Sequence, residues 1–207
     1  MRGLRLLSLG DSYTIGEQVV AEENFPNQTV GLLRKSGYDF ETAEIVATTG
    51  WTTDELQQAI DGLQFNPPSD FVTLLIGVNN QYRGRSVENY KLEFDLLLQH
   101  AIKLAGGKPD HVIILSIPDW GVTPYAADRD RKKIAEEIDE YNEVNNQIAS
   151  DYKVNYIDIT PLTREAAHDS SLLASDGLHP SGKEYTRWAE KIAEVIERGM
   201  HWQYFFK

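Results

Sequence analysis

Serine, aspartate and histidine occur in this sequence at positions where they can form a nucleophile and its base. Ser12 follows a mostly apolar run at residues 4–9, from which Gly10-Asp11 separates it. Asp176 and His179 are three residues apart, so one turn can bring the carboxylate to one imidazole nitrogen while the other nitrogen faces Ser12. A serine hydroxyl becomes a good nucleophile at neutral pH when such a base takes its proton. These residues therefore predict acyl transfer through an acyl-serine.

The same chemistry requires hydrogen-bond donors for the negative oxygen of the tetrahedral intermediate. The candidates are the backbone N–H groups of Ser12 and Gly50 and the side-chain amide of Asn79, since each residue follows a predicted strand. Loss of one such donor typically raises the barrier by about 3 to 4 kcal/mol. Asp11 adjoins the nucleophile but is expected to point away from it and to make structural hydrogen bonds.

The elements that must position these residues alternate regularly along the chain. Apolar runs predict strands, and three- and four-residue periodicity between them predicts helices. The strands are expected at residues 4–9, 40–48, 71–76, 111–117 and 154–159, with a chain break beginning at Asn66. The helices are expected around residues 26–35, 56–63, 90–104, 128–153 and 185–195. Asn24, Ser86 and the pairs Thr52–Glu55 and Ser181–Glu184 are expected to cap four of these helices, and Gly199 is expected to end the last one. This alternation predicts one α/β domain over residues 1–207, with a parallel sheet of about five strands between two helical layers. Ligands bind at the carboxyl ends of such strands, where Ser12, Gly50, Asn79 and the 176–179 loop are all expected.

Taken together, four blocks resemble those of the SGNH hydrolases, also called the GDSL esterases and lipases. They are Gly-Asp-Ser ending at Ser12, the glycine block at Gly50, Gly-x-Asn ending at Asn79, and Asp-x-x-His ending at His179. The resemblance covers essentially the whole chain and implies a flavodoxin-like three-layer α/β/α fold. It also implies that Ser12 is the nucleophile and an oxyanion donor, Gly50 and Asn79 further donors, His179 the base and Asp176 its orienter. The family often has aspartate after Gly-x-Asn, where this chain has Asn80.

Composition narrows the range of partners and cofactors. The 207 residues carry a net charge of -12, which disfavours nucleic acid and anionic membrane surfaces, and the chain has no cysteine. The mechanism requires no metal or cofactor, and no apolar stretch reaches the length of a membrane span. The short N-terminal apolar run does not resemble a signal peptide, so a cytoplasmic location is expected. The aromatic tail at residues 202–206 is compatible with an oligomer contact or with packing on a helix.

The substrate is predicted to be a small ester. Aromatic and polar residues beside the blocks, which are expected to line a pocket, are Tyr13, Trp51, Asn80, Tyr82 and Trp120. Their character favours acetyl or other short-acyl esters, including those on carbohydrate. Arg83 and Arg85 are alternatively suited to a carboxylate or phosphate. A longer-chain lipase, lysophospholipase or thioesterase, and a non-catalytic ligand-binding module, remain alternatives because fold does not fix function. A nucleotide-binding role is disfavoured because residues 10–16 match no phosphate-binding loop.

Overall fold

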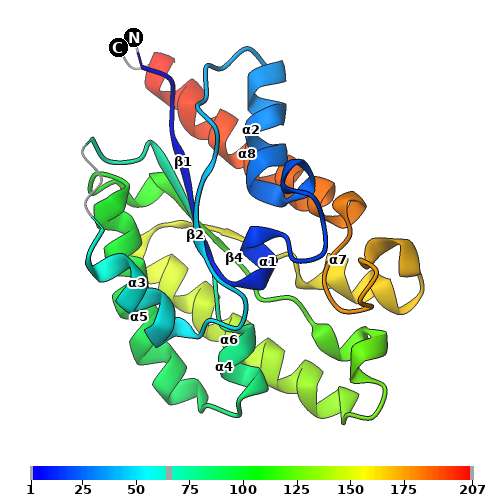
Figure 1. Cartoon of the computed structure of the whole chain (residues 1–207). Coiled ribbons are helices and arrows are strands. Elements are labelled where there is room, and N and C mark those ends of the chain that lie inside the picture. The colour runs from blue at the N-terminus through cyan, green and yellow to red at the C-terminus, as the bar shows by residue number, and fades with distance from the viewer. Residues whose placement is uncertain (1, 64–66, 206–207) are drawn as a thin grey trace.

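The computed structural model describes residues 2–63 and 67–205, and only the backbone is described for residues 201–205. Its centre is a parallel sheet of five strands. Helices surround this sheet (Figure 1). The strands are β1 (Leu6–Gly10), β2 (Glu44–Ala47), β3 (Phe71–Leu75), β4 (Val112–Leu115) and β5 (Asn155–Ile157). Their spatial order is β2-β1-β3-β4-β5, which is the flavodoxin-like order. The predicted fold class is therefore confirmed.

The sheet explains why the first apolar run ends at the nucleophile candidate. Strand β1 lies between β2 and β3, and all five of its residues are buried, as expected for a parallel strand covered on both faces. Its one polar side chain is satisfied inside the sheet, because Thr73 Oγ1 on β3 donates to Ser8 Oγ at 2.8 Å. Since the chain departs on opposite sides after β1 and after β3, a crevice forms between their carboxyl ends.

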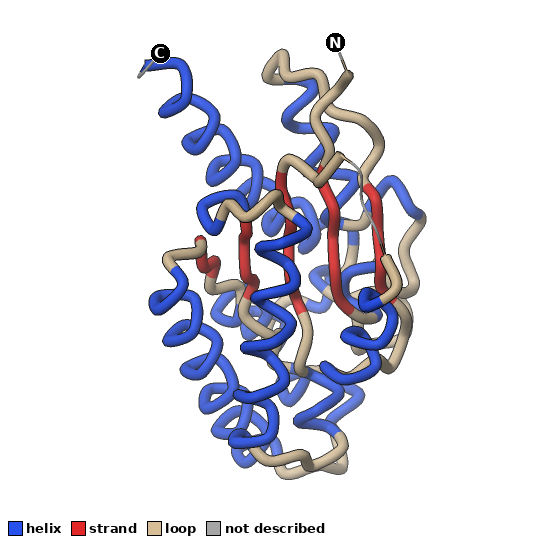
Figure 2. Tube along the Cα trace, turned by 90° about the vertical axis from the view of Figure 1, so that its left-hand side faces the viewer, coloured by secondary structure: helices blue, strands red, loops and turns tan. Residues whose placement is uncertain are grey.

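Helices cover both faces of this sheet. They are α1 (Ser12–Ile15), α2 (Phe25–Lys35), α3 (Thr53–Asp61), α4 (Val78–Tyr82), α5 (Val87–Leu104), α6 (Arg131–Tyr152), α7 (Thr160–Arg164) and α8 (Gly182–Phe205). Short 3₁₀ helices are η1 (Ala21–Glu23), η2 (Pro109–His111), η3 (Trp120–Val122), η4 (Pro124–Ala126), η5 (Glu165–Ala167) and η6 (Ser170–Leu172). Helices α2 and α8 pack together on one face, and α3, α5 and α6 lie on the other (Figures 1 and 2).

Side-chain caps begin the helices where the sequence predicts them. Asn24 accepts from the backbone N–H of Asn27 at 3.0 Å and caps α2. Thr52 and Glu55 form the predicted capping box at the start of α3. Ser86 accepts from the N–H of Asn89 at 3.2 Å and caps α5. These local bonds determine where the chain turns from loop to helix after each strand.

Several element boundaries differ from the prediction. The strand expected at 40–48 is only four residues long, because Phe40 makes no more than an isolated bridge with Leu4. Helix α6 begins at Arg131 because the Asp130 carboxylate accepts from the N–H of Lys133 and acts as its cap. Helix α8 continues through Gly199, since a single helical glycine costs only about 1 kcal/mol relative to alanine. The predicted chain break at Asn66 and the role of the tail at 202–206 lie outside the described residues and side chains.

Candidate active site

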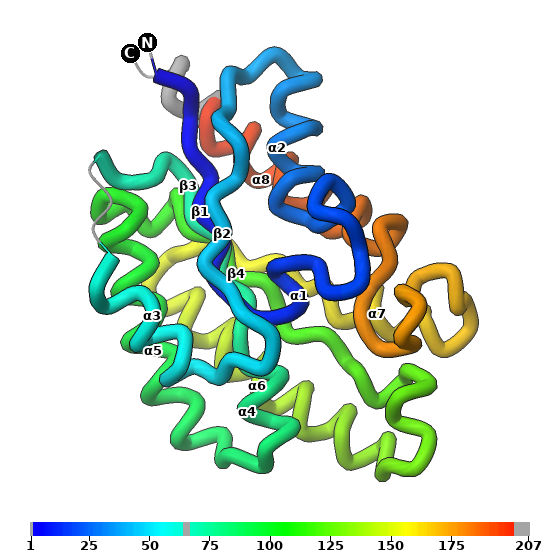
Figure 3. Tube along the Cα trace, viewed as in Figure 1, coloured from blue at the N-terminus to red at the C-terminus, as the bar shows by residue number. Residues whose placement is uncertain are grey.

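Four segments that are distant in the sequence meet at the carboxyl end of the sheet (Figure 3). Ser12 is the first residue of α1, directly after β1, and Asn79 lies in the short helix α4 after β3. Gly50 lies between β2 and α3, and His179 lies in the loop before α8. Together they line one open pocket of about 150 Å³. The crevice between β1 and β3 thus collects the residues that the sequence singled out.

Ser12, His179 and Asp176 form one hydrogen-bonded chain. The Nε2 atom of His179 lies 3.0 Å from Ser12 Oγ, and its Nδ1 atom lies 2.6 Å from Asp176 Oδ2. Ser12 and His179 are buried, with 4% and 8% of their surface exposed. This is the arrangement in which the histidine accepts the serine proton and the aspartate selects the imidazole tautomer.

The Asp176 side chain also shapes the loop that carries His179. Its Oδ1 atom accepts from the backbone N–H groups of Leu178 and His179, each at 3.0 Å. Gly177 supports this tight turn with a φ of 66°. Partial burial would by itself raise the pKa of Asp176, but the hydrogen bonds from His179 and the two backbone groups lower that pKa overall. The carboxylate is therefore held in its ionised form, which stabilises a protonated imidazole.

The two predicted backbone donors, the N–H groups of Ser12 and Gly50, belong to residues that line the same pocket. Within the described residues, neither the Ser12 N–H nor the Gly50 N–H has an intramolecular acceptor. Gly50 has a φ of 85°, a conformation that other residues rarely adopt. Its carbonyl oxygen accepts from Arg83 Nη2 at 2.7 Å, which fixes the orientation of this turn. Two free N–H groups beside a nucleophile can bind a developing oxyanion.

The Asn79 side-chain amide is the third predicted donor, and it is held by two protein acceptors. Its Nδ2 atom lies 3.0 Å from the carbonyl oxygen of Trp51 and 3.3 Å from Asp11 Oδ2. Because the Trp51 carbonyl oxygen requires a donor, the amide nitrogen of Asn79, and not its oxygen, faces the turn of Asp11 and Ser12. The contact with Asp11 is long for an N–H···O bond, so this hydrogen can be shared with a substrate oxygen.

Asp11 has the structural role that its position beside Ser12 predicts. It is fully buried, and its Oδ1 atom accepts from the N–H of Tyr13 at 3.0 Å, so it caps α1. Burial raises the pKa of Asp11 to about 7, although the hydrogen bonds from Tyr13 and Asn79 oppose the rise. The carboxyl group therefore orients both the helix that begins at Ser12 and the amide of Asn79.

The raised pKa of Asp11 predicts a pH-dependent contribution to stability. Below about pH 4 the group is protonated in both states, whereas between about pH 4 and 7 only the unfolded chain ionises it. We therefore compare the free energy of unfolding of wild type with that of Asp11→Asn. The value for wild type minus the value for the variant should decrease by roughly 4 kcal/mol between about pH 4 and 7 and stay constant above that window. Urea denaturation at a series of pH values measures this difference.

A surface aspartate provides the control for this measurement. Hydrogen bonds from Ser171 and Lys183 lower the pKa of Asp169 to about 2. The free energy of unfolding of wild type relative to Asp169→Asn should therefore fall as the pH drops below about 4, which is the opposite direction. A wild-type advantage over Asp11→Asn that grows between pH 4 and 7 would contradict the ionisation behaviour assigned to Asp11.

Aromatic side chains form the rim of the pocket. Trp120 is buried and donates from Nε1 to Gln81 Oε1 at 2.7 Å. Tyr82 packs edge-on against Trp120 with ring centroids 5.3 Å apart, and Tyr125 also packs edge-on against Trp120 at 6.1 Å, with its hydroxyl 3.4 Å from that of Tyr82. Tyr82 and Tyr125 are about half exposed and present ring surface to solvent. Tyr125 also lines the pocket but was not predicted, although it lies only five residues after the predicted pocket residue Trp120.

Two residues predicted to contact the substrate do not line this pocket. Asn80 is fully buried, and its side chain donates to Thr53 Oγ1 at 2.6 Å and accepts from the Thr53 N–H at 3.0 Å. Trp51 is only partly buried and packs against the hydrophobic core. Asn80 therefore joins α4 to α3, and Trp51 contributes through its carbonyl oxygen. Tyr13, Tyr82 and Trp120 do line the pocket.

The two arginines after α4 are also committed to protein partners. Arg85 pairs with Asp54 at 2.5 Å and with Glu93 at 3.5 Å, and Arg83 pairs with Glu55 at 3.4 Å besides holding the Gly50 carbonyl. These contacts leave neither guanidinium available as a dedicated anion receptor. Across residues 2–63 and 67–205 there is no cluster of three or more side chains suited to a metal. In the same residues no helix is long and apolar enough to cross a membrane.

Comparison with known proteins gives a consistent assignment. The GDSL-like lipase/acylhydrolase family matches residues 8–187. No functionally curated protein matches the sequence significantly. Among solved structures, the psychrotrophic esterase EstA from Pseudoalteromonas sp. is 17% identical with a TM-score of 0.72, covering 95% of this chain and 98% of its own.

Two further solved structures are similar to the same extent. The acetylxylan esterase Axe2 from Geobacillus stearothermophilus is 20% identical, with a TM-score of 0.71 and 94% of each chain covered. The lipase/acylhydrolase from Enterococcus faecalis is 20% identical, with a TM-score of 0.67, covering 97% of this chain and 95% of its own. At these identities the similarity establishes the shared fold.

Proposed function

The chain belongs to the GDSL-like lipase/acylhydrolase family, whose members are ester-hydrolysing serine hydrolases, and we propose that it cleaves short-acyl esters. The observation that carries the proposal is the hydrogen-bonded chain from Ser12 through His179 to Asp176 at the wall of a small pocket. The preferred substrates are acetyl esters, including those on carbohydrate.

The mechanism follows from the order of these contacts. His179 Nε2 takes the Ser12 proton as Oγ attacks the ester carbonyl, and the ionised Asp176 stabilises the resulting imidazolium. The backbone N–H groups of Ser12 and Gly50 and the amide of Asn79 stabilise the oxyanion. His179 then returns the proton to the leaving alcohol, which leaves an acyl-serine. Water activated by His179 hydrolyses this intermediate and restores the free hydroxyl.

The size and lining of the pocket support a small substrate. A volume of about 150 Å³ next to Ser12 accommodates an acetyl or similarly short acyl group, and long chains would need further space. The exposed faces of Tyr82 and Tyr125 are suited to stacking on a sugar ring. Axe2 is described as an acetylxylan esterase, and a second structural neighbour of 16% identity is described in the same way.

A fluorophosphonate probe and a substrate panel test this function. The probe phosphonylates an activated serine, and EstA is itself described as inhibited by monoethylphosphonate. We expect labelling at Ser12, with kcat/KM highest for acetyl esters and falling along the p-nitrophenyl series from acetate to octanoate. Acetylated sugars are assayed beside that series.

The two halves of the experiment address different claims. No labelling at Ser12 together with no ester turnover would favour a non-catalytic binding module. Labelling combined with a preference for octanoate would overturn the short-acyl substrate and retain the serine mechanism.

A further inference from the structure

We propose that Tyr13 is a specificity-determining residue that keeps an aliphatic chain of the substrate out of a second, apolar cavity behind the catalytic pocket. The inference rests on the proposed esterase function and adds a cause for its short-chain preference. It depends on the shape and lining of that cavity, on the position of Tyr13 between the two spaces, and on the absence of an available charge there.

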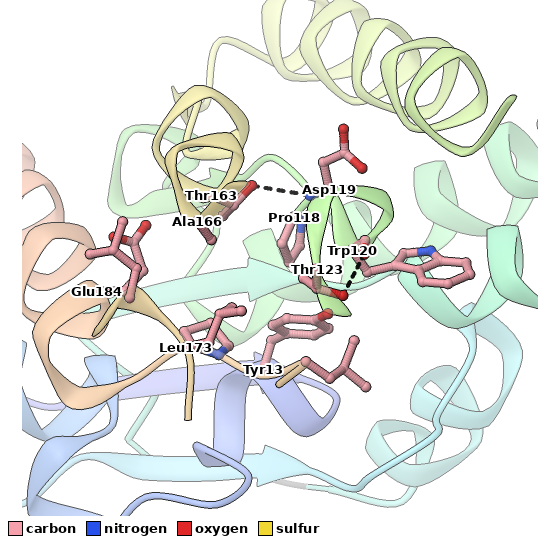
Figure 4. Close-up of a pocket in the computed structure, with 12 residues that line it drawn as sticks. Tyr13, Pro118, Asp119, Trp120, Thr123, Thr163, Ala166, Leu173 and Glu184 are labelled. Atoms are coloured by element: carbon pink, nitrogen blue, oxygen red, sulfur yellow. Dashed lines mark hydrogen bonds between the residues drawn. The ribbon is translucent and has the colours of Figure 1, made fainter. Parts of the chain in front are cut away.

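The second cavity is small and mostly apolar (Figure 4). Its volume of about 20 Å³ is close to that of a single water site. The apolar side chains around it come from the loop after β4, the region after α7 and the loop that carries His179; they are Pro118, Ala166, Leu172, Leu173, Leu178 and Pro180. Such a lining favours a hydrocarbon group over a polar one.

Tyr13 stands between this cavity and the catalytic pocket. Among the described residues, only Tyr13, Trp120 and Leu178 line both spaces. The Tyr13 ring is 4% exposed and lies 5.2 Å from the His179 ring, measured between centroids. Tyr13 directly follows Ser12 in the chain and lines both spaces, so the wall that it forms lies beside the nucleophile. Trp120 is held by its indole N–H on Gln81, and the backbone N–H of Leu178 is held by Asp176, so we assign the separation of the two spaces to the Tyr13 ring.

The charged residues in the cavity wall already have partners. Asp119 Oδ2 accepts from Arg164 Nε at 2.9 Å, and Glu184 Oε2 accepts from Arg187 Nη1 at 2.8 Å. Glu184 Oε1 also accepts from the indole N–H of Trp188 at 2.8 Å. A cationic ligand would have to displace these arginines. The group that fits the enlarged cavity is therefore an unbranched aliphatic chain, supplied either by the acyl part or by the alcohol part of the ester.

The test is a chain-length profile of Tyr13→Leu in two series. One series extends the acyl group from p-nitrophenyl acetate to butyrate and hexanoate, and the other extends the alcohol from ethyl acetate to butyl and hexyl acetate. For each series we compare kcat/KM for the longest substrate with kcat/KM for the shortest. In one of the two series this ratio should be at least roughly tenfold higher for Tyr13→Leu than for wild type, because a single methylene group in an apolar pocket changes kcat/KM by about that factor. The series that responds identifies which part of the ester enters the cavity.

Two matched variants separate the wall from the cavity itself. Tyr13→Phe keeps the ring and removes the hydroxyl, so the ratio should stay at the wild-type value. Leu173→Ala enlarges the cavity and leaves the Tyr13 ring in place, so it should not raise the ratio either. A rise with either variant would overturn the assignment to the Tyr13 ring, and this holds even if Tyr13→Leu folds poorly.

The outcome can be distinguished from a failure of the esterase function. If Tyr13→Leu is labelled by fluorophosphonate and hydrolyses acetate, but both ratios stay unchanged, the gating role of Tyr13 is wrong and the serine mechanism stands. If wild type itself hydrolyses no ester of either series, the esterase function is wrong.

Discussion

Ser12→Ala is expected to lower kcat for p-nitrophenyl acetate by roughly 10⁴- to 10⁶-fold, the range seen when a serine hydrolase loses its nucleophile. The reason is that Ser12 carries the hydroxyl that contacts the base: His179 Nε2 lies 3.0 Å from Ser12 Oγ, and Asp176 holds the opposite side of the imidazole. The backbone N–H groups at Ser12 and Gly50 survive the substitution, so weak residual turnover from oxyanion binding should remain. Steady-state kinetics and loss of fluorophosphonate labelling measure the effect.

A second buried serine provides the control for this variant. Ser8 lies four residues earlier on β1 and accepts a hydrogen bond from Thr73 within the sheet. Ser8→Ala removes the same atom type from the strand that precedes Ser12 and leaves the nucleophile in place, so activity should stay near wild type. If Ser12→Ala, still folded by circular dichroism, turned over ester as fast as wild type, Ser12 would not be the nucleophile.

The sequence predicts the architecture well because burial leaves a strong pattern. Strands such as β1 and β3 are buried along their whole length, so they read as continuous apolar runs. Caps such as Asn24 and Ser86 act within three residues, so they can be recognised locally. With the strands parallel, the carboxyl ends share one edge, and the meeting of Ser12, Gly50, Asn79 and His179 follows from topology.

Two kinds of feature were not predicted: very short helices and contacts between distant residues. Helices α1 and α4 have four and five residues, too few for a helical periodicity to be recognised in the sequence. Asn80 looks like a pocket residue by its place beside Asn79, but one helical step turns its side chain toward Thr53 on α3. Arg83 holds the Gly50 carbonyl from 33 positions away, and no local pattern encodes this contact.

The placement of the pocket wall shows the same limit. Tyr13 adjoins Ser12 in the chain, so its presence at the site is predictable from sequence. Its position between two cavities depends on Pro118 in the loop after β4 and on Leu173 and Leu178 in the loop before α8. The wall of the pocket is therefore built by loops that follow different strands, whereas Ser12, Asp176 and His179 are positioned by short local turns.

Asp176→Asn is expected to lower kcat about 10⁴-fold, because it would leave His179 in the wrong tautomer. The asparagine oxygen can still accept from the backbone N–H groups of Leu178 and His179, which preserves the loop. The amide would then present N–H to His179 Nδ1, so the imidazole would carry its proton on Nε2 and could not accept the proton of Ser12 3.0 Å away.

The matched control is Asp169→Asn, which should retain wild-type kcat. It alters a similar turn, in which Asp169 Oδ1 accepts from the Ser171 N–H at 3.0 Å. Steady-state kinetics at a fixed pH compare the two variants, and the melting temperature checks the fold. A loss of less than tenfold in a folded Asp176→Asn protein would show that His179 acts without a carboxylate to select its tautomer.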